Sequence, residues 1–187
     1  MYMSESNDTK KAIADSLIKL CKERPFDKIT VRDISEDCGV NRQTFYYNFM
    51  DKFDLLEWIY IEQLLNSNLK DVSFDNWVEC LTKTLNCMKD EQRFYVNTIN
   101  HAEDYIRKFA LKHLEKVFTD AIDQLDENNH VDDTNRRFIS RFFAHGVSGI
   151  IIEWVEHNMD ESPEFIAGCM QTLMISCEKA AYNHVKL

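Results

Sequence analysis

The stretch TVRDISEDCGVNRQTFYYNFMDK, residues 30–52, contains two short segments on either side of a glycine and predicts a helix-turn-helix. Thr30 can cap a first helix through its hydroxyl, and Asp33 falls at the third helical position, where a carboxylate is favourable. Gly39 stands where the chain must turn sharply, and glycine adopts a positive φ at little steric cost. Asn41 is a good cap for a second helix. The order of cap, glycine turn and second cap therefore predicts two helices joined by a tight turn.

The second of these segments combines an inward face with an exposed face that is suited to reading DNA. Phe45 and Phe49 lie four residues apart and are expected to point inward. Arginine pairs with guanine and glutamine with adenine, while threonine offers a hydroxyl or a methyl group, so the other face carries side chains for direct base readout. The residues that we expect at the DNA are Thr30, Arg32, Asn41, Arg42, Gln43, Thr44 and Tyr46, with Tyr47 and Lys52 holding phosphates. The alternative is an ordinary pair of amphipathic helices whose polar residues are merely solvated.

From Lys10 to about Leu65 the chain resembles the N-terminal domain of TetR-family transcriptional regulators. The segments that carry this resemblance are KKAIADSLIKLCKERPFDKI, TVRDI, CGV, TFYYNFMDK and DLLEWIY. Cys38 stands where the family commonly has alanine, and Phe45 where leucine or isoleucine is more usual. The segments RQTFYYNF, DLLEWIY and GVSGIIIEWVEHNMDESPEFIA are similar to the branch that contains the activator of dihydroxyacetone kinase operons. This narrower resemblance implies that a protein co-regulator could replace a small-molecule effector.

Length and composition predict an all-α protein with two domains. The chain has 187 residues, of which 44% are hydrophobic, so it can bury a substantial core. Only four glycines and two prolines leave few breaks, and no segment shows the alternation typical of a strand. We expect about nine helices. They divide into a DNA-binding domain over residues 8–52, a connecting helix over 51–69, and a C-terminal effector-binding and dimerisation domain over 70–187.

Hydrophobic periodicity indicates where the remaining helices run. The first is expected from about residue 8 to 23 and buries Ile13, Leu17, Leu20 and Cys21. The connecting helix buries Leu55, Leu56, Ile59 and Tyr60 against the DNA-binding domain. Because it belongs to both domains, we expect it to act as the lever that changes the separation of two DNA-reading domains in a dimer. The C-terminal domain is expected to contain helices near residues 74–88, 90–99, 103–127, 133–157 and 162–184.

The net charge of −10 is unevenly distributed along the chain. Residues 10–52 carry nine Lys and Arg against seven Asp and Glu, a net charge of +2, so the acidic excess lies outside the predicted DNA-binding segment. Such polarity disfavours non-specific coating of nucleic acid and leaves a modest number of phosphate contacts to set the salt dependence.

The sequence contains no pattern that indicates catalysis, a metal, a cofactor or a membrane segment. There is no HExxH, clustered Cys and His spacing, Walker loop, GxGxxG or GxSxG, so we expect neither an enzyme nor a zinc protein. No signal peptide or lipidation motif is present, which favours a cytoplasmic protein. The six cysteines fit that compartment as buried reduced thiols, and a redox sensor is the alternative.

The last two predicted helices are expected to form a dimer interface. The segment 138–155 is apolar on nearly every side, and Ser162 and Pro163 predict the start of a final helix with an apolar stripe. The interface residues that we expect are Phe142, Gly146, Gly149, Ile150, Leu173 and Cys177. The alternative is that both helices are core helices of a monomer. The resemblance implies a four-helix interface built from these two helices of each subunit.

Aromatic and apolar side chains on the helices between the DNA-binding domain and the predicted dimer interface are candidates for an effector pocket, because pockets between bundle helices are apolar with a few polar groups. The expected lining is Trp77, Leu81, Phe94, Tyr95, Tyr105, Phe109 and His145, with Asn97, Asn100 and His101 as further polar anchors. Ordinary core packing would explain the same residues. The first interpretation of the whole chain is a homodimeric repressor that an unknown small molecule releases from a palindromic double-stranded DNA operator. The alternative is an activator or co-regulator controlled by a partner protein.

Overall fold

The computed structural model contains eight α-helices and no strand among the residues that it describes, which are 2–69, 72–73, 75–126 and 131–184. Side chains are described over these ranges except at 2–6, 125 and 177–184. The all-α prediction is confirmed. The elements in chain order are α1 (Tyr2–Cys21), η1 (Phe26–Lys28), α2 (Val31–Asp37), α3 (Arg42–Asn48), α4 (Lys52–Tyr60), η2 (Ile61–Asn66), α5 (Trp77–Asp90), α6 (Gln92–Leu125), α7 (Asp133–Glu156) and α8 (Pro163–His184).

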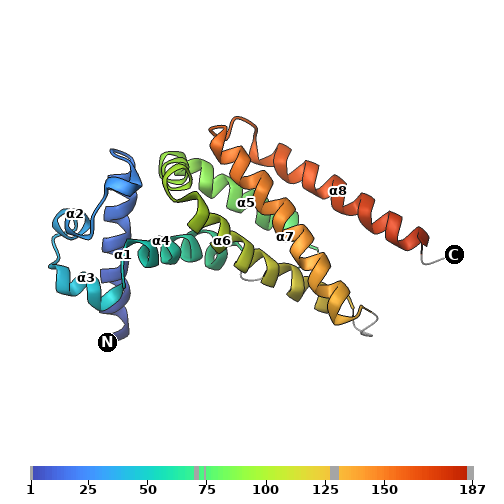
Figure 1. Ribbon diagram of the computed structural model, residues 1–187, viewed down its shortest axis with the longest axis horizontal. Coiled ribbons are helices and arrows are strands. Elements are labelled where there is room, and N and C mark those ends of the chain that lie inside the picture. The colour runs from blue at the N-terminus through green and yellow to red at the C-terminus, as the bar shows by residue number, and fades with distance from the viewer. Residues whose placement is uncertain (1, 70–71, 74, 127–130, 185–187) are drawn as a thin grey trace.

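Helices α1, α2 and α3 form a small bundle at one end of the molecule, which we call the head (Figure 1). The inward face of α1 is buried as predicted, with Ile13, Leu17, Leu20 and Cys21 all at most 6% exposed. Asp37 at the end of α2 accepts hydrogen bonds from Lys19 Nζ at 2.5 Å and Ser16 Oγ at 2.8 Å, both on α1. These two bonds hold the pKa of Asp37 below its usual range and tie the first helix to the second.

Helix α4 leaves the head and runs without interruption into the π-helical turn η2. Asp51 caps it, because its Oδ1 accepts the backbone N–H groups of Phe53 and Asp54. The wider turn of η2 is held by side chains, since Ser67 Oγ donates to the Glu62 carbonyl and Asn68 Nδ2 to the Gln63 carbonyl. The sequence predicts one helix over 51–69, and its hydrophobic spacing carries no sign of this π-helical turn. The predicted inward residues are buried: Leu55, Leu56, Ile59 and Tyr60.

Helices α5 to α8 form the C-terminal body, in which α6 packs along α7 and α5 packs against α8 (Figure 1). The α6–α7 contact includes the rings of Phe118 and Phe143, whose centroids lie 5.5 Å apart. Two separate helices are predicted over 90–99 and 103–127, and the structure joins them into α6 with a kink at Ala102, where φ is −145° and ψ is 30°. The predicted break is therefore present as a kink within one long helix.

The turn between α7 and α8 is held in place by a side chain of α5. Asn158 and Met159 have φ values of 58° and 54°, a left-handed backbone that non-glycine residues rarely adopt. Lys89 Nζ donates to the Met159 carbonyl at 3.1 Å, and the Met159 side chain is 1% exposed. Helix α8 begins as predicted, because Ser162 Oγ accepts the N–H of Phe165. These contacts set the angle at which α8 leaves α7.

One helix in the described part of the chain, α7, is long and apolar enough to cross a membrane by length and composition alone. Core helices of soluble proteins pass the same test. Helix α7 packs on α6, where Arg136 Nη1 pairs with Asp123 at 2.9 Å and Ser140 Oγ lies 3.1 Å from Thr119 Oγ1. These polar contacts are those of a helix in a protein bundle.

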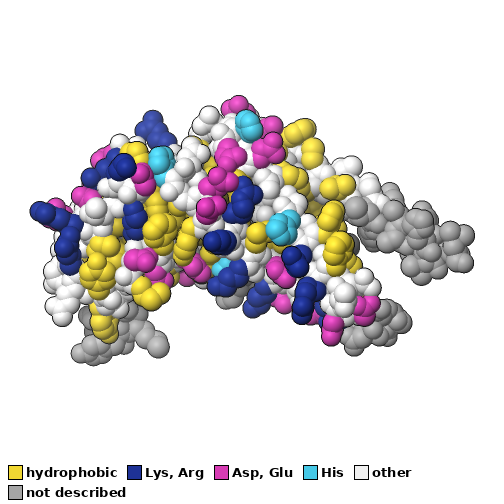
Figure 2. Space-filling model, viewed as in Figure 1, with side chains coloured by type: hydrophobic (Ala, Val, Ile, Leu, Met, Phe, Trp, Pro, Cys, Tyr) yellow, Lys and Arg dark blue, Asp and Glu magenta, His cyan; other side chains and the backbone are white. Residues whose placement is uncertain are grey.

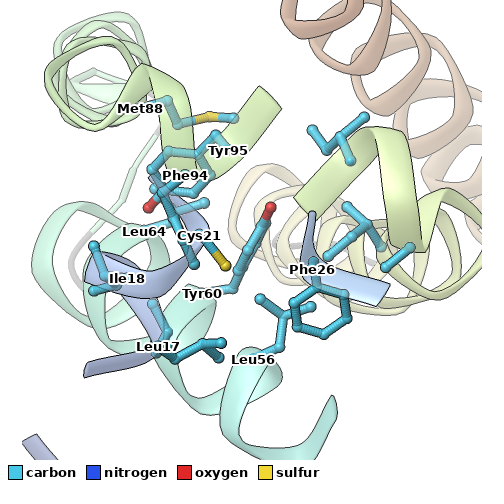
Figure 3. Packing of buried hydrophobic residues seen from close by; sticks show 14 of the residues in the cluster. Leu17, Ile18, Cys21, Phe26, Leu56, Tyr60, Leu64, Met88, Phe94 and Tyr95 are labelled. Carbon is cyan, nitrogen blue, oxygen red and sulfur yellow. The ribbon is translucent and has the colours of Figure 1, made fainter. Parts of the chain in front are cut away.

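A continuous cluster of buried apolar side chains runs from the head through α4 into the body. Figure 3 shows part of this cluster, in which Tyr60 of α4 lies between Phe26 of η1 on one side and Cys21 of α1 with Phe94 and Tyr95 of α6 on the other. The rings of Tyr60 and Tyr95 meet edge to face with centroids 5.2 Å apart. The head therefore shares its core with the body.

Candidate nucleic-acid interface

Helix α2 begins at a capping box, in which a side chain and a backbone group exchange hydrogen bonds. Asp33 N–H donates to Thr30 Oγ1 at 3.2 Å, and Thr30 N–H donates to Asp33 Oδ2 at 2.8 Å. Hydrogen bonds from Thr30 are the main cause that lowers the pKa of Asp33, ahead of the nearby Arg24. The predicted cap is confirmed, and it fixes where α2 begins.

The turn between α2 and α3 has the predicted left-handed glycine. Gly39 has a φ of 73°, and Val40 N–H donates to the Ser35 carbonyl at 3.0 Å to close the turn. A substitution at Gly39 would strain the backbone even though an added Cβ would meet no atom within 4 Å. The glycine is therefore required by backbone conformation rather than by close packing.

Helix α3 is anchored on its inner side and capped at its start. Asn41 Oδ1 accepts the N–H of Thr44 at 2.7 Å and its hydroxyl at 3.1 Å, which confirms the predicted cap. Phe45 and Phe49 are at most 3% exposed, with ring centroids 5.9 Å apart. The inner face holds α3 rigidly, so its outer face is presented in a fixed orientation.

The outer face of α3 is polar and aromatic. Arg42 and Gln43 are exposed and their side chains make no hydrogen bond or ion pair with any described residue. Tyr46 is 57% and Tyr47 is 87% exposed. The rings of Tyr46 and Phe45 meet edge to face, with centroids 5.6 Å apart. Exposed donors without partners and exposed aromatic rings are the groups that a recognition helix offers to a DNA groove.

One exposed apolar side chain beside this face was not predicted from the sequence. Met50 directly follows α3 and is 79% exposed, while its N–H donates to Asp54 Oδ2 at 2.8 Å. The one sequence signal for the exposure of Met50 is its position next to the inward Phe49, because a residue adjacent to an inward one points in another direction.

The remaining predicted residues lie around α3 with their polar groups partly engaged. Arg32 is exposed on α2 and pairs with Glu36 at 2.6 Å, a contact between two exposed groups that is weak in water. The hydroxyls of Thr30 and Thr44 serve the caps of their own helices. Arg32 lines a shallow surface pocket together with Asn41 and Arg42 at the start of α3.

The structure gives Lys52 a different role from the predicted phosphate contact. Its Nζ donates to the carbonyls of Phe26, Asp27 and Ile29 at 2.8, 3.2 and 2.9 Å. The ammonium has only three N–H donors, so all of them are used inside the protein. Burial lowers the pKa of Lys52, with nearby Asp27 opposing that shift. The prediction from its position next to the recognition segment was wrong, because the side chain turns back beneath η1.

The predicted effector-pocket residues do not surround one common space. Phe94, Tyr95 and Phe109 are at most 8% exposed and pack with Tyr60 in the core. Trp77, Leu81 and Tyr105 are half-buried at the edges of the body. His145 is exposed on the outer side of α7, because the neighbouring Ala144 and Ser148 take the inner side. For His145 the prediction was wrong, and the effector site itself remains a prediction.

The three further polar anchors also have other positions. Asn97 Nδ2 donates to the carbonyls of Cys21 and Arg24, so this side chain binds the end of α1. His101 is exposed, and its Nδ1 lies 2.9 Å from the Asn97 carbonyl. Asn100 is exposed.

Helices α7 and α8 carry an exposed apolar surface, which we call the α7–α8 face. Of the predicted interface residues, Phe142, Gly146, Ile150 and Leu173 are exposed and Gly149 is half-exposed, whereas the Cys177 side chain lies outside the described residues. Figure 2 shows hydrophobic side chains on the surface over these helices. Further large apolar residues are more than 40% exposed in the same two helices: Phe138, Phe165 and Ile175.

Comparison with known proteins assigns the family. Residues 75–176 match the family model described as transcriptional regulator C-terminal region, and residues 13–59 match the model for bacterial regulatory proteins of the tetR family. The chain belongs to the TetR family of transcriptional regulators. It is therefore a DNA-binding regulator, and the resemblance seen in the helix-turn-helix segment is confirmed.

Individual relatives agree with this assignment. The chain is 28% identical over 159 residues to the HTH-type dhaKLM operon transcriptional activator DhaS of Lactococcus lactis subsp. lactis strain IL1403. The matched region covers 82% of each protein. A solved structure of the dihydroxyacetone kinase operon activator DhaS superposes with a TM-score of 0.71 at 25% identity, covering 92% of this chain and 97% of that one. NalD, the secondary repressor of the MexAB-OprM multidrug efflux pump in Pseudomonas aeruginosa, has the same fold, with a TM-score of 0.62 at 16% identity over 92% of this chain and 96% of its own.

Proposed function

We propose that this regulator binds a palindromic operator as a homodimer, with α3 of each subunit in a major groove. The observation that supports this proposal most directly is the exposed face of α3, where Arg42, Gln43, Tyr46 and Tyr47 extend from a helix whose other side is buried. Arg32, Thr30 and Asn41 flank it and would contact the DNA backbone or adjacent bases. The DNA-binding domain over residues 8–52 and the effector and dimer domain over 70–187, joined by the helix over 51–69, belong to the same proposal.

Dimerisation through the α7–α8 face would cover its exposed apolar side chains. Monomeric soluble proteins rarely expose a large contiguous apolar patch, and two-fold contacts are the commonest oligomeric arrangement. A two-fold dimer also presents two recognition helices to two half-sites, which suits a palindromic operator. The protein would work without catalysis, in the cytoplasm where the operator lies.

An effector would control DNA binding by favouring one separation of the two heads. In the leading form a small molecule releases a repressor from its operator. The second form is an activator or co-regulator controlled by a partner protein, and it is favoured by the relative whose name describes a transcriptional activator, DhaS.

The test begins with selection of a binding site from random-sequence duplex DNA by the purified protein. Fluorescence anisotropy with the selected duplex then measures affinity for the wild type and for Arg42→Ala. The proposal is supported if the selected sequence is a palindrome and the Arg42→Ala variant binds it more weakly than the wild type does. Failure to enrich any sequence contradicts the proposal. Adding a metabolite extract or a protein fraction to the complex separates the two modes of control.

A further inference from the structure

Phe26, in the linker between α1 and α2, lies where the head, the connecting helix and the body meet. Its N–H donates to Asn97 Oδ1 of α6 at 2.8 Å, and its carbonyl accepts Lys52 Nζ of α4 at 2.8 Å. Its ring is fully buried, meets Phe53 edge to face at 5.4 Å, and lies 4.6 Å from the Lys52 ammonium. One residue of the head is thus held on one side by α4 and on the other by α6.

Asn97 uses its whole amide group in this contact. Its Nδ2 donates to the Cys21 carbonyl at 2.5 Å and the Arg24 carbonyl at 2.7 Å, while its Oδ1 accepts from Phe26. The last carbonyls of a helix have no partner within the helix, so Asn97 satisfies groups that the end of α1 leaves open. The amide orientation is set by this pattern, because carbonyls require a donor and an N–H requires an acceptor.

An ion pair lies along the same seam between head and body. Lys22 Nζ is 2.6 Å from Glu91 Oε2, immediately before α6, and both side chains are partly exposed. Through Asn97 and Glu91, the first part of α6 therefore contacts the end of α1 and the linker that follows it. None of these contacts among the described residues involves the exposed face of α3.

The orientation of the head determines how far apart two recognition helices lie. A helix of 20 residues is about 30 Å long, so a tilt of about 10° at the seam moves its far end by about 5 Å. That exceeds the rise of about 3.4 Å for one base pair. A change at the seam would therefore alter the preferred half-site spacing without altering any base contact.

We propose that Asn97, a residue of the C-terminal body, is a positioning residue for DNA binding that sets the half-site spacing the dimer accepts. It does so by fixing α1 and Phe26 to α6, so that the two heads of a dimer keep one separation. This inference rests on the proposed homodimer. It predicts that removing the amide widens the range of accepted spacings.

The test compares wild type, Asn97→Ala and a matched control, Asn100→Ala, which removes an exposed asparagine three residues along the same helix. The probes are the palindrome selected by the wild type, the same half-sites moved one or two base pairs closer or farther apart, and a single half-site. For Asn97→Ala we expect affinity at the selected spacing to fall about 5- to 20-fold and the spacing profile to flatten. Asn100→Ala should keep the wild-type profile, and base preference within a half-site should be unchanged in all three.

Two outcomes overturn the inference while leaving the proposed function intact: an unchanged spacing profile in Asn97→Ala, or an equal loss at every spacing and on the single half-site, which would mark a purely structural role. If the wild type itself shows no spacing preference, the proposed palindrome-binding dimer has failed instead, and the inference falls with it. Lys22→Gln provides a milder variant at the exposed ion pair, and it should broaden the profile in the same direction. If circular dichroism shows that Asn97→Ala does not fold, the spacing profile of Lys22→Gln tests the inference instead. An unchanged spacing profile in Lys22→Gln then refutes it.

Discussion

The hydroxyls of Tyr60 on α4 and Thr98 on α6 lie 2.8 Å apart, with the two residues 3% and 0% exposed. Thr98 Oγ1 also lies 3.0 Å from the Phe94 carbonyl, to which it donates, so it accepts from Tyr60. Burial raises the pKa of Tyr60, which keeps its hydroxyl a neutral donor. This bond joins the connecting helix to the body inside the shared core.

The two partners are expected to respond unequally to substitution. Thr98→Val leaves the Tyr60 hydroxyl buried without an acceptor and should lower the free energy of unfolding by about 1 to 3 kcal/mol. Tyr60→Phe leaves Thr98 its bond to the Phe94 carbonyl and should cost only about 0.5 to 1.5 kcal/mol. Urea denaturation followed by circular dichroism measures both. A larger loss in Tyr60→Phe than in Thr98→Val would contradict the assigned donor and acceptor.

Substitutions on the exposed face of α3 should weaken operator binding without destabilising the fold. Arg42→Ala, Gln43→Ala and Tyr46→Ala each remove an exposed side chain, and each lost base contact should cost about 1 to 3 kcal/mol of binding free energy. Anisotropy titration on the selected duplex measures the loss, and thermal unfolding checks the fold. Arg93→Ala, which removes an exposed arginine of α6, is the control. Wild-type affinity in all three α3 variants would exclude this face as the reading surface.

Local signals were sufficient to predict the head from the sequence. The caps at Thr30 and Asn41, the left-handed Gly39 and the inward pair Phe45 and Phe49 each depend on residues within a few positions, and all are present in the structure. Short-range spacing fixes such features because they arise within one turn or one helix.

The features that were missed depend on residues far apart in the chain. Lys52 reaches carbonyls 23 to 26 residues away, and Asn97 reaches Phe26 across 71 residues, so no local pattern indicates either contact. Apolar spacing also cannot separate a pocket lining from a filled core, which is why Phe94 and Tyr95 fitted both interpretations. His145 was assigned to the wrong side of α7 because nearly every position around it is apolar.

Lys52→Met should affect stability rather than the salt dependence of DNA binding. The substitution removes the Nζ donor from three carbonyls around η1, of which the Phe26 carbonyl keeps the Ile29 N–H, at a cost of about 1 to 3 kcal/mol in unfolding free energy. A lysine that contacts a phosphate would instead reduce the slope of log affinity against log salt by about 1. Measuring the slope for wild type and variant distinguishes the two roles. If the salt slope of Lys52→Met is reduced by about one unit while its stability is unchanged, Lys52 contacts a phosphate as first predicted.

The proposed dimer is tested most cleanly at Gly149. A Cβ added there meets no atom within 4 Å among the described residues of its own chain, so Gly149→Ala should fold normally. Gly149→Leu and Leu173→Asp are expected to produce monomers or weakened dimers in sedimentation experiments, because the first blocks close approach and the second buries an unpaired charge. Lys108→Gln, at an exposed position of α6 outside the α7–α8 face, serves as the control. Sedimentation of the wild type as a monomer at micromolar concentration would refute the interface.

Mild acid should destabilise the fold through His113. This ring is half-buried on α6, its centroid lies 4.4 Å from that of Phe109, and burial lowers its pKa from 6.5. Lys112 and Lys116 lower it further, while Glu57 of α4, with Oε1 3.9 Å from Nε2, opposes them. A histidine whose folded pKa is depressed takes up its proton first in the unfolded state, so stability is retained above pH 6.5 and declines as pH falls below that value.

The free energy of unfolding should therefore decrease between pH 7.5 and 5.5, with a slope for one proton of at most about 1.4 kcal/mol per pH unit. His113→Gln removes the titrating ring and should flatten this dependence, although loss of the contact with Phe109 lowers stability at every pH. His157→Gln, at an exposed position on the end of α7, controls for removal of a histidine. Urea denaturation at several pH values measures the three slopes. If His113→Gln and the wild type lose stability in parallel on acidification, another group causes the decline and the half-buried ring takes no part in it.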